Sequence, residues 1–413
     1  MGIILHGCDM NARVSIARSA SVGDYGAIRA AVAEAIEGVC DLRELIEPGQ
    51  SVVLKPNVFC PRPAPTTTDP RVVVAVGELA REAGAGRVIV AEGRSLSTAR
   101  YRAQHNRTRD CFDVVGMTEA IAQAGFEVVY LEEDAFSEVD VPGADLLRRA
   151  AVPRTILEAD VLINLPVMKI HSLTYVTLAI KNLHGVVSDA DKQFQHGYRD
   201  LALARKLVDI LRIRRPDLNV LDGLVGQEGD HATEGRPVEM GLVLASRDPV
   251  ALDAVAGAVM GFEPSEVDTT RIAGEQGLGE ADLASIEVTG APIAEVRRPF
   301  ARPDIELSEQ EFPGLRLFAG DYCRSCSYYV RRGLDRLKRE GLLDADHPLA
   351  LVVGRDPEVP GEVSCPVFVL GDCALESDSV KQVEDRLLTR GGLHSIAACP
   401  PMAFRIRAVE MLD

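Results

Sequence analysis

Four cysteines near the C-terminus have the spacing and the neighbours of metal ligands. Cys323 and Cys326 form a C-x-x-C pair, whose tight turn can present two thiolates to one metal centre. Cys373 lies in the GDCA sequence at the end of the apolar segment PVFVLG, and Cys399 precedes two prolines that suit the first turn of a helix. A helix N-terminus favours the anionic form of a thiol. These four cysteines are therefore the predicted metal ligands.

The chemistry of four thiolates fits either a [4Fe–4S] cluster or a structural zinc ion. Zinc sites usually use two close pairs of ligands, whereas only one close pair is present here. The Cys-Pro-Pro sequence at Cys399 resembles the last cluster ligand of the small iron–sulfur subunit of respiratory complex I. We expect a [4Fe–4S] cluster, with zinc and the absence of any metal as the alternatives. Cys365, which precedes a strand, is expected to be structural.

A second group of reactive side chains follows the apolar segment ADVLINLP. Ligand sites in parallel α/β sheets form at the carboxyl ends of strands, so basic and polar groups there predict a site for a small anionic molecule. A solvated helix face is the alternative, but the spacing of Lys169 and His171 is not that of an i,i+4 surface ladder. The predicted catalytic residues are Lys169, His171, Lys181 and Asp222, and the predicted substrate-binding residues are Lys55, Asn57, Thr67, Thr68, Thr177 and Asn182.

An acidic, glycine-rich segment, LVGQEGDHATEGRP, follows Asp222. Its oxygen-bearing side chains suit a divalent cation, or the segment forms a mobile lid with solvated charges, which we favour. Asp222, placed at the end of the preceding strand, is the best candidate for a functional carboxylate. The charged residues of the segment include Glu228, Asp230, His231 and Glu234.

The hydrophobic pattern predicts the elements that position these groups. An apolar strand at Val52–Leu54 is followed by a helix that Asp69 and Pro70 open, and then by the strand RVIVAEG. This order predicts a β-α-β unit with a parallel crossover, and it recurs along the chain. The strands are continuous apolar runs, which indicates a sheet covered on both faces. Residues 1–300 are therefore predicted to be an α/β domain with a mostly parallel sheet and helices on both faces.

A change of composition marks a second domain. Residues 291–314 are rich in proline and charge, which indicates a linker or a connection draped over the surface. Beyond it, helices and apolar strands alternate again. Residues 315–413 are predicted to form a smaller α/β module that binds the iron–sulfur cluster.

The charge and hydropathy of the chain exclude several classes of function. The 413 residues have a net charge of −17, which disfavours nucleic acids and anionic membrane surfaces as partners. No apolar stretch reaches the length of about 18 residues that a transmembrane helix needs, and the N-terminus lacks the basic region of a secretory signal. We therefore expect a cytoplasmic protein with reduced thiols.

Several motifs in order resemble the domain of unknown function 362 family, over roughly residues 12–262. The resemblance implies an iron–sulfur redox protein without a defined reaction, because members often contain a ferredoxin-like cluster segment. This sequence lacks a C-x-x-C-x-x-C-x-x-x-C-P run and has the dispersed cysteines instead. The matching motifs are Leu54–Asn57, Thr66–Pro70, Met168–His171, Thr177–Gly185, Leu221–Gly223 and Arg247–Ala256.

These features predict an iron–sulfur oxidoreductase that acts on a small anionic organic substrate, with an electron-donor protein as a partner. The cluster would relay single electrons while basic groups hold the substrate and move protons. Two alternatives remain. One is a non-redox isomerase or transferase with a structural or Lewis-acid cluster, and the other is an electron carrier without a substrate.

Overall fold

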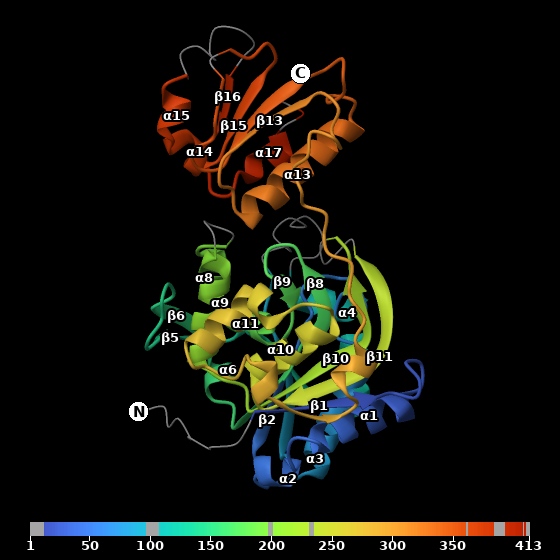
Figure 1. The fold of residues 1–413 in the computed structure, drawn as a ribbon. Helices are drawn as coiled ribbons and strands as arrows, with labels where there is room; N and C mark the ends of the chain where they lie inside the picture. The colour runs from blue at the N-terminus through green and yellow to red at the C-terminus, as the bar shows by residue number, and fades with distance from the viewer. Residues whose placement is uncertain are drawn as a thin grey trace. The chain divides into compact units, whose positions relative to one another are not determined.

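The structure of the protein is a computed structural model that describes residues 12–95, 107–196, 201–230, 235–360, 362–383, 393–407 and 409. The chain divides into two compact units, which are considered separately (Figure 1). Unit 1 comprises Met1–Phe194 and Ala204–Pro303, and unit 2 comprises Gln195–Leu203 and Asp304–Asp413.

The described part of unit 1 is built on a ten-stranded sheet with the order β12-β1-β11-β10-β7-β2-β3-β4, to which β8 and β9 are added beside β10. Neighbours from β10 to β4 are parallel, so their carboxyl ends share one edge, whereas β11 is antiparallel to both β1 and β10. The strands are β1 (Arg13–Arg18), β2 (Ser51–Pro56), β3 (Arg87–Glu92), β4 (Glu127–Tyr130), β7 (Val161–Leu165), β8 (Val167–His171), β9 (Tyr175–Thr177), β10 (Leu218–Glu228), β11 (Arg236–Ser246) and β12 (Glu287–Gly290).

Helices pack on both faces of this sheet, and a separate two-stranded sheet is formed by β5 (Phe136–Asp140) and β6 (Arg149–Pro153). The 3-10 segments that bear on the site are η2 (Leu131–Glu133) and η3 (Leu183–Val186). The helices are α1 (Tyr25–Glu37), α2 (Leu42–Leu45), α3 (Pro70–Glu82), α4 (Thr108–Val114), α5 (Met117–Ala124), α6 (Arg154–Leu157), α7 (Ala179–Asn182), α8 (Asp189–Gln193), α9 (Ala202–Ile213), α10 (Pro249–Val259), α11 (Asp268–Glu275) and α12 (Ile293–Val296).

Alternation along the central strands separates two hydrophobic cores. In β11, Val243 and Ala245 join the core that includes α1 and α3, whereas Leu242 and Leu244 join the core that includes α10. Successive side chains of a strand point to opposite faces, so one strand supplies both cores. Each fully buried aliphatic side chain contributes roughly 1.5–3 kcal/mol to folding. The predicted α/β class, with a mostly parallel sheet and helices on both faces, is confirmed.

The predicted start of α3 is also observed. The Asp69 side chain accepts a hydrogen bond from Arg71 N at 2.9 Å, and Pro70 occupies the first helical position. An N-cap of this kind typically stabilises a helix by about 1 kcal/mol. The cap fixes where the loop from β2 turns into the helix, and this loop lies beside the candidate site.

One sequence prediction, the placement of Asp222, is wrong. Strand β10 does not end there but continues to Glu228, so Asp222 lies within a strand and the glycine-rich stretch up to Glu228 is not a lid. The glycines permit close packing rather than a loop, because a Cβ at Gly226 would lie 2.6 Å from the Phe300 ring. His231 and Glu234 lie outside the described residues.

Unit 2 has its own four-stranded parallel sheet in the described residues, with the order β13-β14-β15-β16. Strand β13 was not predicted from the sequence, because its short LRLFA run follows directly on the proline-rich connection. Two hydrophobic cores lie on the two faces of this sheet. The strands are β13 (Leu315–Ala319), β14 (Leu349–Val353), β15 (Val367–Leu370) and β16 (Leu393–Ile396), and the helices are α13 (Arg324–Arg339), α14 (Asp372–Glu376), α15 (Asp378–Lys381) and α17 (Met402–Arg407).

Because each unit has its own cores, we expect a fragment of residues 1–303 to fold without unit 2. The expected result is a soluble fragment with cooperative thermal unfolding in near-ultraviolet circular dichroism. A matched fragment that ends at Ser246 should aggregate, because it lacks α10 and exposes the core beneath that helix. Aggregation of the 1–303 fragment as well would show that the two units depend on a shared core.

Candidate functional site

A buried ion pair joins the carboxyl ends of two neighbouring parallel strands. Lys55 is the penultimate residue of β2 and its side chain is 0% exposed. Its Nζ lies 2.9 Å from Oε1 of Glu92, which ends β3. Glu92 also accepts hydrogen bonds from the backbone N–H groups of Val58 (3.1 Å) and Gly93 (2.8 Å). Both carboxylate oxygens are therefore occupied. A buried pair of this kind is costly to break, because removing one partner leaves the other charge without compensation.

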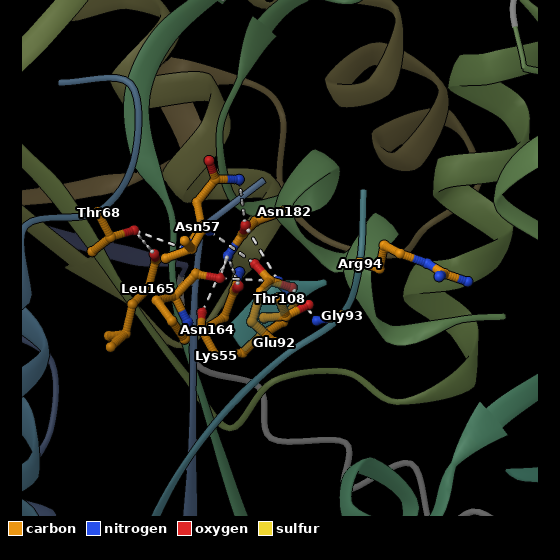
Figure 2. A network of polar contacts seen from close by, with 12 residues as sticks. Lys55, Asn57, Thr68, Glu92, Gly93, Arg94, Thr108, Asn164, Leu165 and Asn182 are labelled. Carbon is orange, nitrogen blue, oxygen red and sulfur yellow. Dashed lines mark hydrogen bonds and ion pairs between the residues drawn. The ribbon is translucent and has the colours of Figure 1, made fainter. Parts of the chain in front are cut away.

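Asparagine side chains extend this ion pair into a buried hydrogen-bond network (Figure 2). Asn182 Oδ1 accepts from Asn57 Nδ2 at 2.7 Å and from Lys55 Nζ at 3.4 Å. Asn182 Nδ2 donates to Asn164 Oδ1 at 2.7 Å. Thr68 Oγ1 accepts from Asn57 N at 2.8 Å and so fixes the start of the loop after β2. The structure thus brings together Lys55, Asn57, Thr68 and Asn182, which were predicted from three separate segments.

Lys169 lies on the same network. This residue belongs to β8 and is 1% exposed. Its Nζ donates hydrogen bonds to Asn57 Oδ1 and to the carbonyl oxygen of Thr66, both at 2.6 Å. The ammonium group also lies 4.2 Å from the centroid of the Phe59 ring. These contacts supply oxygen acceptors and an aromatic face, but no carboxylate.

Burial lowers the pKa of every lysine in this region. The pKa of Lys169 falls to about 7 and that of Lys181 to about 8, chiefly through loss of hydration. Repulsion among Lys55, Lys169 and Lys181 adds to the effect. Lys192 and Lys206 are also buried, and loss of hydration is the main reason that their pKa values are lowered. An unpaired ammonium group in such surroundings favours the neutral amine.

The five lysines outnumber the carboxylates that contact them. Within the described residues, the ion pairs formed by this group are Lys55 with Glu92 and Lys192 with Asp189, the latter at 3.7 Å. Lys181 is only partly buried and has no hydrogen-bond or ion-pair partner in this part of the chain. This part of unit 1 therefore holds more basic side chains than described carboxylate partners, in a chain whose net charge is −17.

Two polar groups that flank Lys169 have no partner among the described residues. In the strand register, Lys169 stands opposite Thr177 of β9 and Gln227 of β10. The Oγ1 of Thr177 and the Oε1 of Gln227 are buried without a hydrogen bond, and the other end of the Gln227 amide donates to Thr66 Oγ1 at 3.2 Å. Such an unsatisfied group costs about 1–3 kcal/mol. A ligand or water that bonded to both groups would remove this penalty.

The remaining predicted residues of unit 1 have different surroundings. His171 Nδ1 accepts from Leu173 N at 3.1 Å and Thr174 N at 3.3 Å, so it shapes the turn between β8 and β9. Asp222 accepts from Asp69 N at 2.8 Å, and burial raises its pKa to about 7. Thr67 Oγ1 donates to the carbonyl oxygen of Arg62 at 2.8 Å. These contacts orient the loops around the lysines, and the predicted chemical roles of these residues stay predictions.

Sequence reasoning missed three residues that build the site. Glu92 was not identified, although a carboxylate at the end of an apolar strand beside Lys55 is a usable signal. Gln227 lies in the segment that was predicted to be a lid, so it was not considered as a site residue. Asp253 is buried on α10 and accepts from Ala179 N (2.6 Å) and Ile180 N (3.1 Å), so it positions α7, which carries Lys181. Burial raises the pKa of Asp253 to about 8.

The four predicted ligand cysteines of unit 2 lie at the starts of three helices. Cys323 caps α13 and Cys326 lies in its first turn, Cys373 lies in the first turn of α14, and Cys399 precedes α17. The pKa of the Cys326 thiol is raised chiefly by a hydrogen bond with Cys323 and, next in size, by burial. The nearby Cys399 and Cys373 raise it further. All four thiols therefore lie in one neighbourhood.

The four thiols are not arranged as a preformed metal site. Among the described residues, no group of three or more His, Cys, Asp or Glu side chains is close enough together to hold a metal ion. Cys365 belongs to the core on the opposite face of the sheet from Cys326, because the two cores take alternate residues of β14 and β15.

No helix in the described part of the chain is long and apolar enough to span a membrane.

Comparison with solved structures gives only distant similarity. The lactate racemase apoprotein of Thermoanaerobacterium thermosaccharolyticum aligns with a TM-score of 0.41 and 8% identity, over 94% of this chain and 84% of that one. A protein of Thermotoga maritima solved by a structural genomics consortium aligns with a TM-score of 0.35 and 11% identity, over 80% and 71% of the two chains.

Sequence comparison is more informative. The chain is 30% identical over 271 residues to a thylakoid-associated protein of Synechocystis sp., which covers 64% of this chain and 79% of that protein. Residues 52–258 match the family described as "Domain of unknown function (DUF362)". This segment contains Lys55, Glu92, Lys169, Lys181 and Asn182, and so most of the network described above. The chain therefore belongs to the DUF362 family.

Proposed function

We propose that unit 1 binds a small organic anion at its lysine-rich edge and that unit 2 holds a [4Fe–4S] cluster, so that the protein is an iron–sulfur oxidoreductase. The observation that supports anion binding most directly is the group formed by Lys55, Lys169 and Lys181, whose one ion pair among the described residues is with Glu92. A bound carboxylate or phosphate would restore the missing countercharge.

The anion has defined contacts in this proposal. Lys181 offers an amino group without a hydrogen-bond or ion-pair partner among the described residues, and Lys169 offers an ammonium group held by oxygen acceptors. Thr177 and Gln227 offer a hydroxyl and an amide oxygen that lack partners within the described residues. A hydroxyl or N–H group on the ligand would satisfy Gln227. The geometry therefore suits a small acid that also contains a hydrogen-bond donor.

Lys169 is the best candidate for proton transfer. Its pKa of about 7 means that both the ammonium and the amine are populated at neutral pH. A general acid or base works best when its pKa is near the working pH, so Lys169 can deliver or accept a proton at the ligand. Lys55 is less suited to this role, because Glu92 pairs with it directly and stabilises the charged form.

The cysteines of unit 2 fit an iron–sulfur cluster in donor type and number. Three other thiols lie close enough to Cys326 to raise its pKa, and Gly371 also lies beside the Cys326 Sγ, which would be 3.8 Å from a Cβ at that position. Mutual repulsion and burial disfavour thiolates here in the absence of a positive centre, and coordinated iron supplies that centre. A bound cluster would exchange single electrons, which calls for an electron-donor protein as a partner.

A reaction that needs only proton transfer is the second candidate. Two groups favour it, because burial brings the pKa values of both Lys169 and Asp222 to about 7. In that case the cluster would be structural. Reversible bleaching of the visible absorption by dithionite, with a midpoint that shifts when oxalate binds, supports the oxidoreductase. A cluster that cannot be reduced would favour proton transfer alone.

Removing a site lysine should weaken anion binding. We expect Lys169→Met and Lys181→Met each to raise the Kd for oxalate or phosphate about 10- to 100-fold, because a charge-assisted contact contributes about 1.5–3 kcal/mol. Isothermal titration calorimetry measures this change. Lys381→Met is the matched control, since this lysine is 56% exposed in unit 2. Equal weakening in all three variants would mean that the effect is general electrostatics rather than a site.

The pH dependence of stability should report the buried lysines. The pKa of Lys169 is near 7 in the folded chain and 10.5 when unperturbed, so the unfolded chain binds more protons between these values. The free energy of unfolding without ligand should therefore rise with pH above 7, by up to about 1.4 kcal/mol per pH unit for one such group. Urea titrations of wild type and Lys169→Met should show a smaller slope in the variant. An unchanged slope would contradict the lowered pKa.

Anaerobically purified protein should contain about four irons per chain, as a cubane cluster requires. Cys323→Ser and Cys399→Ser should lose most of the iron and the visible absorption, because each removes a ligand. Cys365→Ser is the matched control and should keep both, since Cys365 lies in the other core of unit 2. Zinc in place of iron would refute the cluster, and loss of iron in Cys365→Ser would refute this ligand set.

A further inference from the structure

A pocket of about 310 Å³ opens at the carboxyl ends of β3 and β4 in unit 1. Arg94 lies two residues after the end of β3, and the segment after β4 supplies further lining residues. In open α/β sheets the carboxyl ends of the strands are the usual place for ligands. The lining residues that matter for its chemistry are Arg94, Leu131, Glu132, Phe136, Val187, Asp189 and Lys192.

One end of the pocket is cationic. Lys192 Nζ donates to the carbonyl oxygen of Arg94 at 2.6 Å, and its nearest described carboxylate is Asp189 Oδ1 at 3.7 Å. Burial lowers the pKa of Lys192 although Asp189, Glu92 and Glu132 act in the opposite direction. The Lys192 ammonium therefore shares its ion-pair partner, Asp189, with Arg94, and it lies at the pocket wall.

The other charged groups leave room for an anion. One terminal nitrogen of Arg94 binds Asp189, and the rest of this guanidinium forms no other side-chain hydrogen bond or ion pair within the described residues. Glu132 is already engaged, because it accepts from the backbone and hydroxyl of Thr108 (2.7 and 2.8 Å) and from Arg94 N (3.2 Å). An acidic head group can thus reach two cations whose neighbouring carboxylates are occupied.

Part of the pocket lining is apolar. Leu131 and Val187 are each 1% exposed, whereas the Phe136 residue is 40% exposed. Phe136 is one of five large apolar residues that are exposed in the described part of the chain, and it lines the pocket. An exposed aromatic ring beside buried aliphatic groups is the usual lining of a small-molecule site.

Two glycines separate this pocket from the lysine network. A Cβ at Gly93 would lie 2.3 Å from Gly185 O and 3.2 Å from Lys192 Nζ, and one at Gly185 would lie 2.3 Å from Glu92 Oε1. The two backbones meet without space for a side chain, so Lys55 and Glu92 lie behind them. Figure 2 shows the Arg94 side chain pointing away from the network.

We propose that this pocket is a second ligand site, for a small molecule with one acidic head and a flat apolar body. The head, a carboxylate or a phosphate, binds Lys192 and Arg94, and the body lies against Phe136 and Leu131. This site differs from the anion site proposed above, because the Gly93–Gly185 contact lies between them.

Ligand-observed NMR with phenylacetate and phenyl phosphate tests the proposal on the full chain. Both probes should bind wild type, and benzyl alcohol, which has the same ring without the acid, should bind at least about tenfold more weakly. Lys192→Met and Arg94→Met should each weaken both probes about tenfold or more. Phe136→Ser should weaken them too, and it keeps the test valid if a Lys192 variant does not fold, because this position is exposed.

The controls separate this pocket from the lysine network. Lys381→Met, at an exposed position in unit 2, should leave probe binding unchanged. Loss of binding in Lys169→Met with full binding in Lys192→Met would place the probes in the network and overturn the second site. Absence of binding by both probes, or binding of benzyl alcohol equal to that of the acids, would also overturn it. Stronger binding of phenyl phosphate would identify the head group as phosphate, and the reverse order a carboxylate.

Discussion

A buried ammonium group must keep a countercharge or give up its proton, and the candidate site depends on this constraint. Lys55 meets it by pairing with Glu92, and the asparagines around the pair satisfy the remaining donors and acceptors. Lys169 meets it only in part, because its contacts are neutral oxygens and an aromatic ring. The strands and glycines that hold these groups leave little freedom to rearrange. This unmet charge is the basis of the anion site proposed for this edge of unit 1.

Local signals in the sequence were sufficient for much of the fold. Asp69 and Pro70 opened a helix where predicted, and the apolar run before Pro166 formed a strand of a mostly parallel sheet. Asp222 was misplaced because Gly223 and Gly226 are common in loops, whereas here they let β10 pass close to Leu242 and Phe300. From the sequence alone, each glycine was interpreted as the end of a strand, because the neighbouring residue that requires a glycine at that position is distant in sequence.

The sequence predicted several of the residues that form the site, but not the contacts between them. Parallel strands share a carboxyl edge, so the convergence of Lys55, Lys169 and Asn182 followed from topology. Glu92 and Gln227 were missed, because their roles depend on strand register between segments far apart in sequence. The cysteines of unit 2 show the same contrast. Their positions at helix starts were predictable, whereas the open arrangement of the thiols was not.

The protonation state of Lys169 tests the account most directly. The 13Cε shift of lysine can be followed by NMR from pH 5 to 11, with Lys169→Met used to assign the signal. The account predicts an apparent pKa near 7 in the free protein, and a pKa at least about one unit higher with saturating oxalate, since a bound anion stabilises the ammonium form. A Lys169 pKa near its ordinary value of about 10.4, unchanged by oxalate, would contradict the claim that this edge lacks a countercharge.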